Sequence, residues 1–218
     1  PTFEALGQGH GYVLYRRHFN QPISGVLKAD GIADYGIVYV NGTKVGELNR
    51  VTGKDSIEVE IPFNSTLDIL VENLGRINYG ARISESFKGF TRPITINDNT
   101  IEGEWKMYRL PMDKAPQLSA SDHGYVQGLP VIYQGTFNIN NVGDTFLDME
   151  QWGKGIVFVN GINLGRYWHV GPQQTLYLPG CFLKKGQNEI VIFEQLNDSR
   201  KTILSGIETP KLDVLKKQ

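Results

Sequence analysis

The 218-residue chain lacks the features that several functional classes require. Its single cysteine excludes an intrachain disulfide framework and a zinc site built from cysteines. Its 22 Lys and Arg residues balance 23 Asp and Glu residues, so the sequence has no basic footprint for nucleic acid. No apolar run approaches the length of a membrane-spanning helix, which is about 18 residues. We therefore expect neither a nucleic-acid nor a membrane partner.

The chain also lacks an initiating methionine. It begins with Pro1, and no signal-peptide pattern follows. We therefore expect it to belong to something larger, whether as a processed protein, as an excised fragment or as the downstream part of a long gene.

Long helical periodicity is absent, whereas glycine is abundant, at 25 residues spread between short apolar runs. Ser56–Ile61 alternates strictly between polar and apolar residues, which predicts a half-buried strand. Ile37–Val40 and Ile156–Val159 are rich in β-branched residues, and each run ends at an Asn-Gly hairpin signal. Many short strands separated by turns predict an all-β sandwich or barrel. Further predicted strands are Val13–Arg17, Leu67–Val71, Ile94–Asn97, Trp105–Leu110, Val131–Gly135, Leu176–Leu178 and Glu189–Glu194.

An internal repeat indicates two copies of one domain. Gly36–Gly46 and Gly155–Gly165 are identical at seven of eleven positions, at an offset of 119. Upstream, Val13-Leu14-Tyr15 matches Val131-Ile132-Tyr133, and downstream Asp68–Val71 parallels Glu189–Ile192. A period this long is typical of whole domains and not of solenoid repeats. We place the domains at 1–115 and 116–218, with a linker rich in Pro, Ser and Gly within 114–128.

The second copy resembles a known family. Gly155–Trp168, followed by Gly171–Pro179, resembles the C-terminal β-domain of glycoside hydrolase family 35 β-galactosidases. Val71–Gly80 of the first copy resembles the preceding β-domain. The resemblance implies two jelly-roll β-sandwiches of the galactose-binding-like type, which in the family follow a catalytic (β/α)8 barrel. It also implies a periplasmic, secreted or lysosome-like location.

No residue of this chain is predicted to be catalytic. A retaining glycosidase needs two carboxyl groups about 5–5.5 Å apart, and the resemblance implies that the barrel supplies both. Glu102 and Glu104 would share a strand face here, where a solvated pair is the favoured interpretation. We expect no cofactor, and no metal site because the histidines lack ligand spacing (His10, His18, His123 and His169).

One loop matches a family motif. Arg76, Asn78 and Tyr79 occupy fixed positions of the family's Gly-Arg-x-Asn-Tyr-Gly pattern. The resemblance implies that this loop lies near the mouth of the active site, and our hypothesis is that Tyr79 borders the aglycone side of the pocket. The alternative is that Arg76 and Asn78 only fix a tight turn.

A second candidate is the run Arg166, Tyr167, Trp168 and His169, which follows the second Asn-Gly turn. Aromatic rings and planar polar groups hold sugars, so this run could form a sugar platform. The alternative is that Tyr167 and Trp168 alternate between faces, one in the core and the other docked on a neighbouring domain.

The leading hypothesis is a non-catalytic C-terminal region of a retaining β-galactosidase, which buttresses the barrel and shapes its entrance. Its partners would be its own N-terminal barrel, with a β-galactoside ligand and a second copy of the chain as further candidates. The alternatives are an independent carbohydrate-binding module and a structural or oligomerisation module without sugar affinity. A docking role predicts an exposed apolar patch on this chain.

Overall fold

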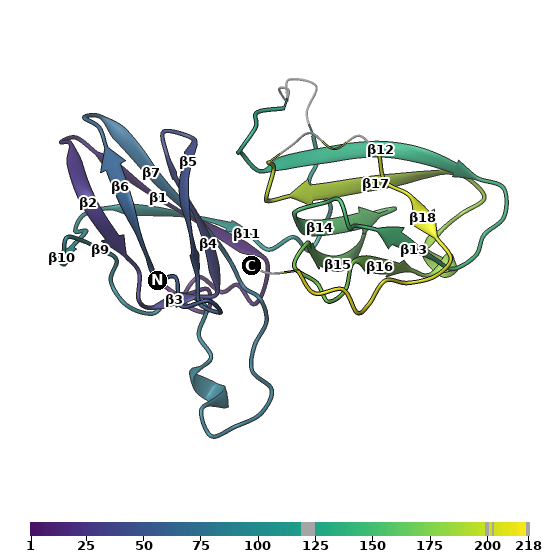
Figure 1. The fold of residues 1–218 in the computed structure, drawn as a ribbon, viewed down its shortest axis with the longest axis horizontal. Coiled ribbons are helices and arrows are strands. Elements are labelled where there is room, and N and C mark those ends of the chain that lie inside the picture. The colour runs from purple at the N-terminus through teal and green to yellow at the C-terminus, as the bar shows by residue number, and fades with distance from the viewer. Residues whose placement is uncertain (119–124, 199–200, 202, 217–218) are drawn as a thin grey trace. The chain divides into compact units, whose positions relative to one another are not determined.

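The computed structural model describes residues 1–118, 125–198, 201 and 203–216. The chain forms two compact units, Pro1–Met112 and Asp113–Gln218, which we name the first and the second sandwich. Part of the predicted linker, including Ser119, Ser121, Asp122 and Gly124, lies outside the described residues. Within the described residues the strands dominate and the helices are two short 3-10 turns, η1 (Ile83–Glu85) and η2 (Gly180–Phe182). The predicted all-β fold is confirmed (Figure 1).

The first sandwich packs a five-stranded sheet against a four-stranded one. Both sheets contribute to one core, in which Leu27 and Ile61 from one sheet meet Val13 and Ile69 from the other. The larger sheet comprises, in spatial order, β11 (Trp105–Leu110), β1 (Tyr12–Phe19), β7 (Ser65–Glu72), β4 (Tyr35–Val40) and β5 (Thr43–Asn49). The smaller comprises β10 (Asn99–Thr100), β9 (Thr95–Ile96), β2 (Ile23–Lys28) and β6 (Ser56–Ile61), and a ribbon pairs β3 (Ile32–Ala33) with β8 (Gly89–Phe90).

The second sandwich repeats the plan with fewer strands. Its core joins Val157 and Ile192 of one sheet to Leu147 and Leu178 of the other. The larger sheet comprises β12 (Val131–Ile139), β17 (Gly186–Glu194), β14 (Lys154–Val159) and β15 (Ile162–Trp168). The smaller comprises β16 (Thr175–Leu178), β13 (Thr145–Asp148) and β18 (Gly206–Ile207).

The repeat seen in the sequence is structural. Each copy has a hairpin whose turn puts Asn and Gly at positive φ, at Asn41-Gly42 and at Asn160-Gly161. This is the geometry of the type I′ turn that the Asn-Gly signal predicts. Each hairpin also shifts register at the same point, after Val38 in one copy and after Val157 in the other. Strands β1, β7, β4 and β5 therefore correspond to β12, β17, β14 and β15.

The register corrects one detail of the sequence comparison. Tyr39 pairs with Asp68 in the first sandwich, and its counterpart Phe158 pairs with Val191 in the second. Asp68 therefore corresponds to Val191, so the parallel with Glu189 is wrong by two residues. Because side chains alternate with period two along a strand, a slip of two leaves every residue on its expected face.

Candidate functional site

The loop of residues 73–88 leaves the first sandwich after β7 and returns at β8 (Figure 1). Both ends of the loop are tied to one buried carboxylate. Lys88 Nζ lies 2.9 and 2.8 Å from the two oxygens of Asp34, and both residues are almost fully buried. The Asp34 carboxylate also accepts the backbone N–H of Leu74 at 2.8 Å and a hydrogen bond from Arg50 at 3.0 Å. Asp34 therefore fixes where the loop starts and where it ends.

A second set of contacts braces the loop just beyond this buried pair. The Arg76 guanidinium pairs with Glu4 and donates to the carbonyls of Ser86 at 2.7 Å and Gly9 at 3.3 Å. Glu4 in turn accepts the backbone N–H of Lys88. Burial alone raises the pKa of the Glu4 carboxyl, but the hydrogen bonds from backbone N–H groups and from Arg76 outweigh it and hold the pKa below its ordinary value. Arg76 therefore links the two arms of the loop to the N-terminal segment.

The loop presents large apolar side chains to solvent, both at its tip and next to its braced base. The Tyr79 ring is 91% exposed, and Ile77, Ile83 and Phe87 are each more than 40% exposed. An ordinary surface loop carries small and polar residues, so four large apolar side chains within eleven positions form an unusual patch. We name these four residues the loop patch.

The structure therefore separates the three residues that the motif singled out. Arg76 belongs to the braced base of the loop, whereas Asn78 and Tyr79 lie exposed at the tip. In this geometry Arg76 can fix the turn while Tyr79 serves as a contact residue, so the two interpretations are compatible.

The run Arg166–His169 is divided between the two faces of β15. Tyr167 is buried in the core, edge-on to Trp152 at 6.3 Å, and donates its hydroxyl to the carbonyl of Phe193 at 3.3 Å. Because neighbouring side chains of a strand alternate, Arg166 and Trp168 occupy the other face. There the Nζ of buried Lys154 lies 4.5 Å from the centroid of the Trp168 ring.

His169 follows β15 and is held by the turn before β14. Its backbone N–H donates to the carbonyl of Gly153 at 2.7 Å, and its Nδ1 lies 3.2 Å from the same oxygen. The four residues of the run therefore do not form one continuous platform.

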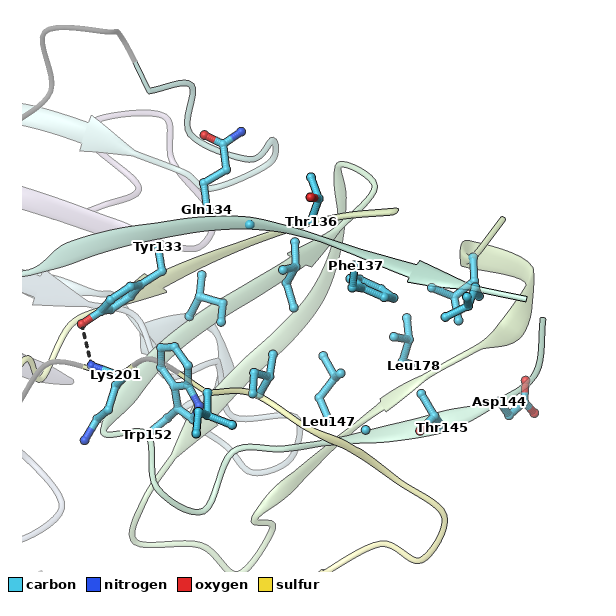
Figure 2. Close-up of a pocket in the computed structure, with 18 of the residues that line it drawn as sticks. Tyr133, Gln134, Thr136, Phe137, Asp144, Thr145, Leu147, Trp152, Leu178 and Lys201 are labelled. Atoms are coloured by element: carbon cyan, nitrogen blue, oxygen red, sulfur yellow. Dashed lines mark hydrogen bonds between the residues drawn. The ribbon is translucent and has the colours of Figure 1, made fainter. Parts of the chain in front are cut away.

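The second sandwich contains a cavity of about 680 Å³ between its two sheets. Figure 2 shows Tyr133 and Phe137 of β12 pointing into it, opposite Leu147 and Leu178. The Tyr133 ring meets Trp152 edge-on at 5.3 Å, and its hydroxyl accepts the backbone N–H of Lys201 at 3.0 Å (Figure 2). The cavity walls are mainly apolar.

Comparison with known families accounts for both sandwiches. Residues 1–111 match the family model described as β-galactosidase, first all-beta domain. Residues 130–188 match the model described as β-galactosidase, galactose-binding domain. The chain belongs to the β-galactosidase β-domain family. The predicted galactose-binding-like type of the fold is thereby confirmed.

Curated relatives agree with this assignment. A β-galactosidase of Xanthomonas manihotis is 42% identical over 80% of this chain, and human β-galactosidase-1-like protein 2 is 39% identical over 89%. The chain spans only 29% and 31% of the length of these two relatives. Among solved structures, a β-glucuronidase of Bacteroides uniformis matches 97% of this chain and 23% of its own at 16% identity, with a TM-score of only 0.31.

In the β-galactosidase β-domains of this chain, the acidic pair considered from the sequence lies outside the strands. Glu102 and Glu104 precede β11 and do not lie on a strand as expected, and both are exposed. Across residues 1–118, 125–198, 201 and 203–216, no three His, Cys, Asp or Glu side chains are grouped to hold a metal ion. His123 lies outside those residues. No described helix is long and apolar enough to cross a membrane.

Two features escaped sequence reasoning. Asp34 and Lys88 are 54 positions apart, and no local sequence pattern predicts that they pair. The cavity was also missed, although the alternation of Tyr133, Gly135 and Phe137 with polar residues could have indicated a sheet face with a small residue at its centre.

Proposed function

We propose that the chain is the non-catalytic C-terminal β-domain region of a retaining β-galactosidase. The enzyme's catalytic barrel hydrolyses terminal β-galactosyl residues, and this region buttresses the barrel. The loop of residues 73–88 borders the substrate entrance, with Tyr79 on the aglycone side. Family membership supports the enzyme class, and the loop supports the role within it.

The observation that carries this proposal is the contrast between the base of the loop and its tip. The base is fixed by the buried Asp34–Lys88 pair and by Arg76, whereas Tyr79 is 91% exposed. A rigid base lowers the entropy that the loop loses when a partner covers it. The ring of Tyr79 can then stack on an apolar sugar face or on an aglycone, and the other members of the loop patch can pack on the barrel.

Steady-state kinetics of a full-length β-galactosidase that carries this chain would test the role of Tyr79. We expect Tyr79→Ala to lower kcat/KM for a β-galactoside about tenfold, which equals about 1.4 kcal/mol of transition-state stabilisation. Phe63→Ala is the matched control, because Phe63 is a 67% exposed aromatic residue of the same sandwich that precedes β7, whereas the loop follows the other end of that strand. The melting temperature should be unchanged in both variants. Unchanged kinetics in Tyr79→Ala would refute the proposed role.

A second candidate function, a carbohydrate-binding module, is favoured by the cavity of the second sandwich, whose lining includes the rings of Tyr133 and Trp152 as well as polar groups such as Thr145. An NMR titration of the chain with galactose, lactose and β-linked galactobiose would test whether this chain binds sugar and where. Saturable shifts at these residues would favour a binding module. Shifts that depend on Trp168 would instead assign sugar binding to the run Arg166–His169.

A further inference from the structure

Strand β12 forms the outer edge of its sheet (Figure 1). Among the described residues it pairs only with β17, over nine consecutive positions from Val131 to Ile139. The corresponding strand of the first sandwich, β1, pairs with β7 on one side and is covered on the other by the antiparallel strand β11. Strand β11 belongs to the same polypeptide as β1. The fold therefore has a place for a covering strand, and within the described residues only the first copy fills it.

The edge of β12 lacks the protection that outer strands normally carry. Soluble proteins guard such edges with charged residues, proline or a bulge, because an unprotected edge pairs with other strands. The outer strands β5 and β15 each carry charged residues and a register shift, and β11 carries Lys106 and Arg109. Strand β12 has no charged residue, no proline and no register shift. Its sequence therefore suits a position inside a sheet, with a neighbour on each side.

The inner face of β12 is also incompletely covered. Tyr133 and Phe137 point into the cavity of about 680 Å³ and are only partly buried (Figure 2). In the first sandwich, Tyr15 corresponds to Tyr133 and is 2% exposed. Ile203 also lines the cavity and is 77% exposed, so the cavity opens to solvent at this residue. A strand beside β12 would cover the backbone edge and direct every second side chain towards the cavity.

The observations favour the rest of a longer polypeptide as the source of this strand. The chain spans 29% and 31% of the length of two relatives, so more than two thirds of each relative lies outside the matched region. A segment tethered to the same polypeptide has an effective concentration on the order of millimolar when its linker is short. A separate partner would instead lose its full translational and rotational freedom on binding. Strand β11 is the precedent, because it covers β1 from within one polypeptide.

We propose that a segment of the same longer polypeptide, outside residues 1–218, adds to β12 as an antiparallel strand in the place that β11 takes beside β1. The segment has apolar side chains at alternate positions, which enter the cavity beside Tyr133 and Phe137. Its other side chains lie on the face of Gln134 and Thr136, which point away from the cavity (Figure 2). This inference rests on the longer enzyme of the proposed function. It concerns the sandwich that does not carry Tyr79, so either proposal can fail without the other.

Photo-cross-linking in a full-length β-galactosidase that carries this chain tests the pairing. A photoreactive phenylalanine analogue replaces Thr136, which is exposed on β12. In the matched control the analogue replaces Glu189, which pairs with Thr136 from the inner strand β17. We expect position 136 to cross-link to a peptide outside residues 1–218 in a product with the mass of a single polypeptide, and position 189 to reach that peptide much less.

Three results would overturn the proposal. The first is a product with the mass of two polypeptides, which would assign the edge to a second copy. The second is a failure of position 136 to reach any peptide outside residues 1–218. The third is equal cross-linking from positions 136 and 189, which would show a body lying over the sheet face and not a strand paired at its edge.

Hydrogen exchange in the same enzyme gives a second readout. With a neighbour on each side, β12 should exchange as slowly as β1. Replacing the cross-linked segment by a Gly-Ser linker of equal length should speed exchange in β12 at least about tenfold and leave β1 unchanged. Exchange in β12 that is already fast in the wild-type enzyme, or that the replacement does not change, would contradict the added strand.

Discussion

The two sandwiches share four strands, a hairpin turn and a register shift, and they differ at their ends and edges. After β7 the first sandwich makes the long braced loop with the loop patch, and β11 forms the outer strand of its larger sheet. After β17 the second sandwich continues towards β18 and leaves β12 at the edge. The strands that the two sandwiches share therefore form the fold, whereas the loop and edge strands that differ between them offer distinct contacts.

The two sandwiches also differ at one inner position of the corresponding strands β7 and β17. The inner position of β7 that pairs with Gly36 holds the apolar Val71, whereas the corresponding position of β17, which pairs with Gly155, holds Glu194. The Glu194 carboxylate accepts the backbone N–H groups of Gly153 at 3.0 Å and Lys154 at 2.9 Å. At this corresponding position the first copy therefore holds Val71 and the second Glu194, while Asp34 serves the loop of one copy and Glu194 the entry to β14 in the other.

The largest expected effect concerns the base of the loop. Lys88→Met leaves Asp34 buried without its main counter-charge, so the first sandwich should lose about 3–5 kcal/mol of stability. Hydrogen exchange measured by mass spectrometry, peptide by peptide, would show faster exchange in the first sandwich than in the second. Adding Asp34→Asn to Lys88→Met should restore part of the loss. If Lys88→Met and the double variant were both as stable as wild type, the buried Asp34–Lys88 pair would not hold the loop.

The next effect compares equivalent core positions. Ile69 and Ile192 occupy the same place in the two copies, but Ile192 lines the cavity. Large-to-small substitutions cost about 2–5 kcal/mol, and less where the site is already loosely packed. We expect Ile69→Ala near the upper end of this range and Ile192→Ala near the lower end, measured by urea unfolding. Equal losses would contradict the difference in packing.

The smallest effect is a dependence on pH. Burial raises the pKa of the Glu194 carboxyl above its ordinary value, and the hydrogen bonds from backbone N–H groups offset this only in part. The stability linked to this acid is therefore fully present below its unfolded pKa and is lost as pH rises through the folded pKa. The stability of wild type relative to Glu194→Gln should fall over that window, in the second sandwich only. A difference between wild type and Glu194→Gln that stays constant with pH would contradict this prediction.

Local patterns predicted much of the fold. Strict alternation located β6, and the predicted strand Trp105–Leu110 is β11, both with the bounds that the structure shows. The Asn-Gly signals placed both hairpins. Strands β2 and β13 were missed because their short, mixed sequences have no clear period.

The candidate site was predictable only in outline. The motif around Tyr79 pointed to the loop through family resemblance, whereas the brace from Asp34 to Lys88 depends on tertiary contacts between distant residues. The run Arg166–His169 looked like one cluster because sequence proximity does not show that neighbours on a strand face opposite ways.

The central claim is that the loop of residues 73–88 faces the catalytic barrel, and photo-cross-linking tests it most directly. A photoreactive phenylalanine analogue would replace Tyr79 in a full-length β-galactosidase that carries this chain, and the cross-linked peptide would be identified by mass spectrometry. The same analogue at Phe63 is the control. The account predicts cross-links from position 79 to barrel peptides near the active site and none of these from position 63. Cross-links from position 79 that reach only the β-domains or a second copy would contradict it.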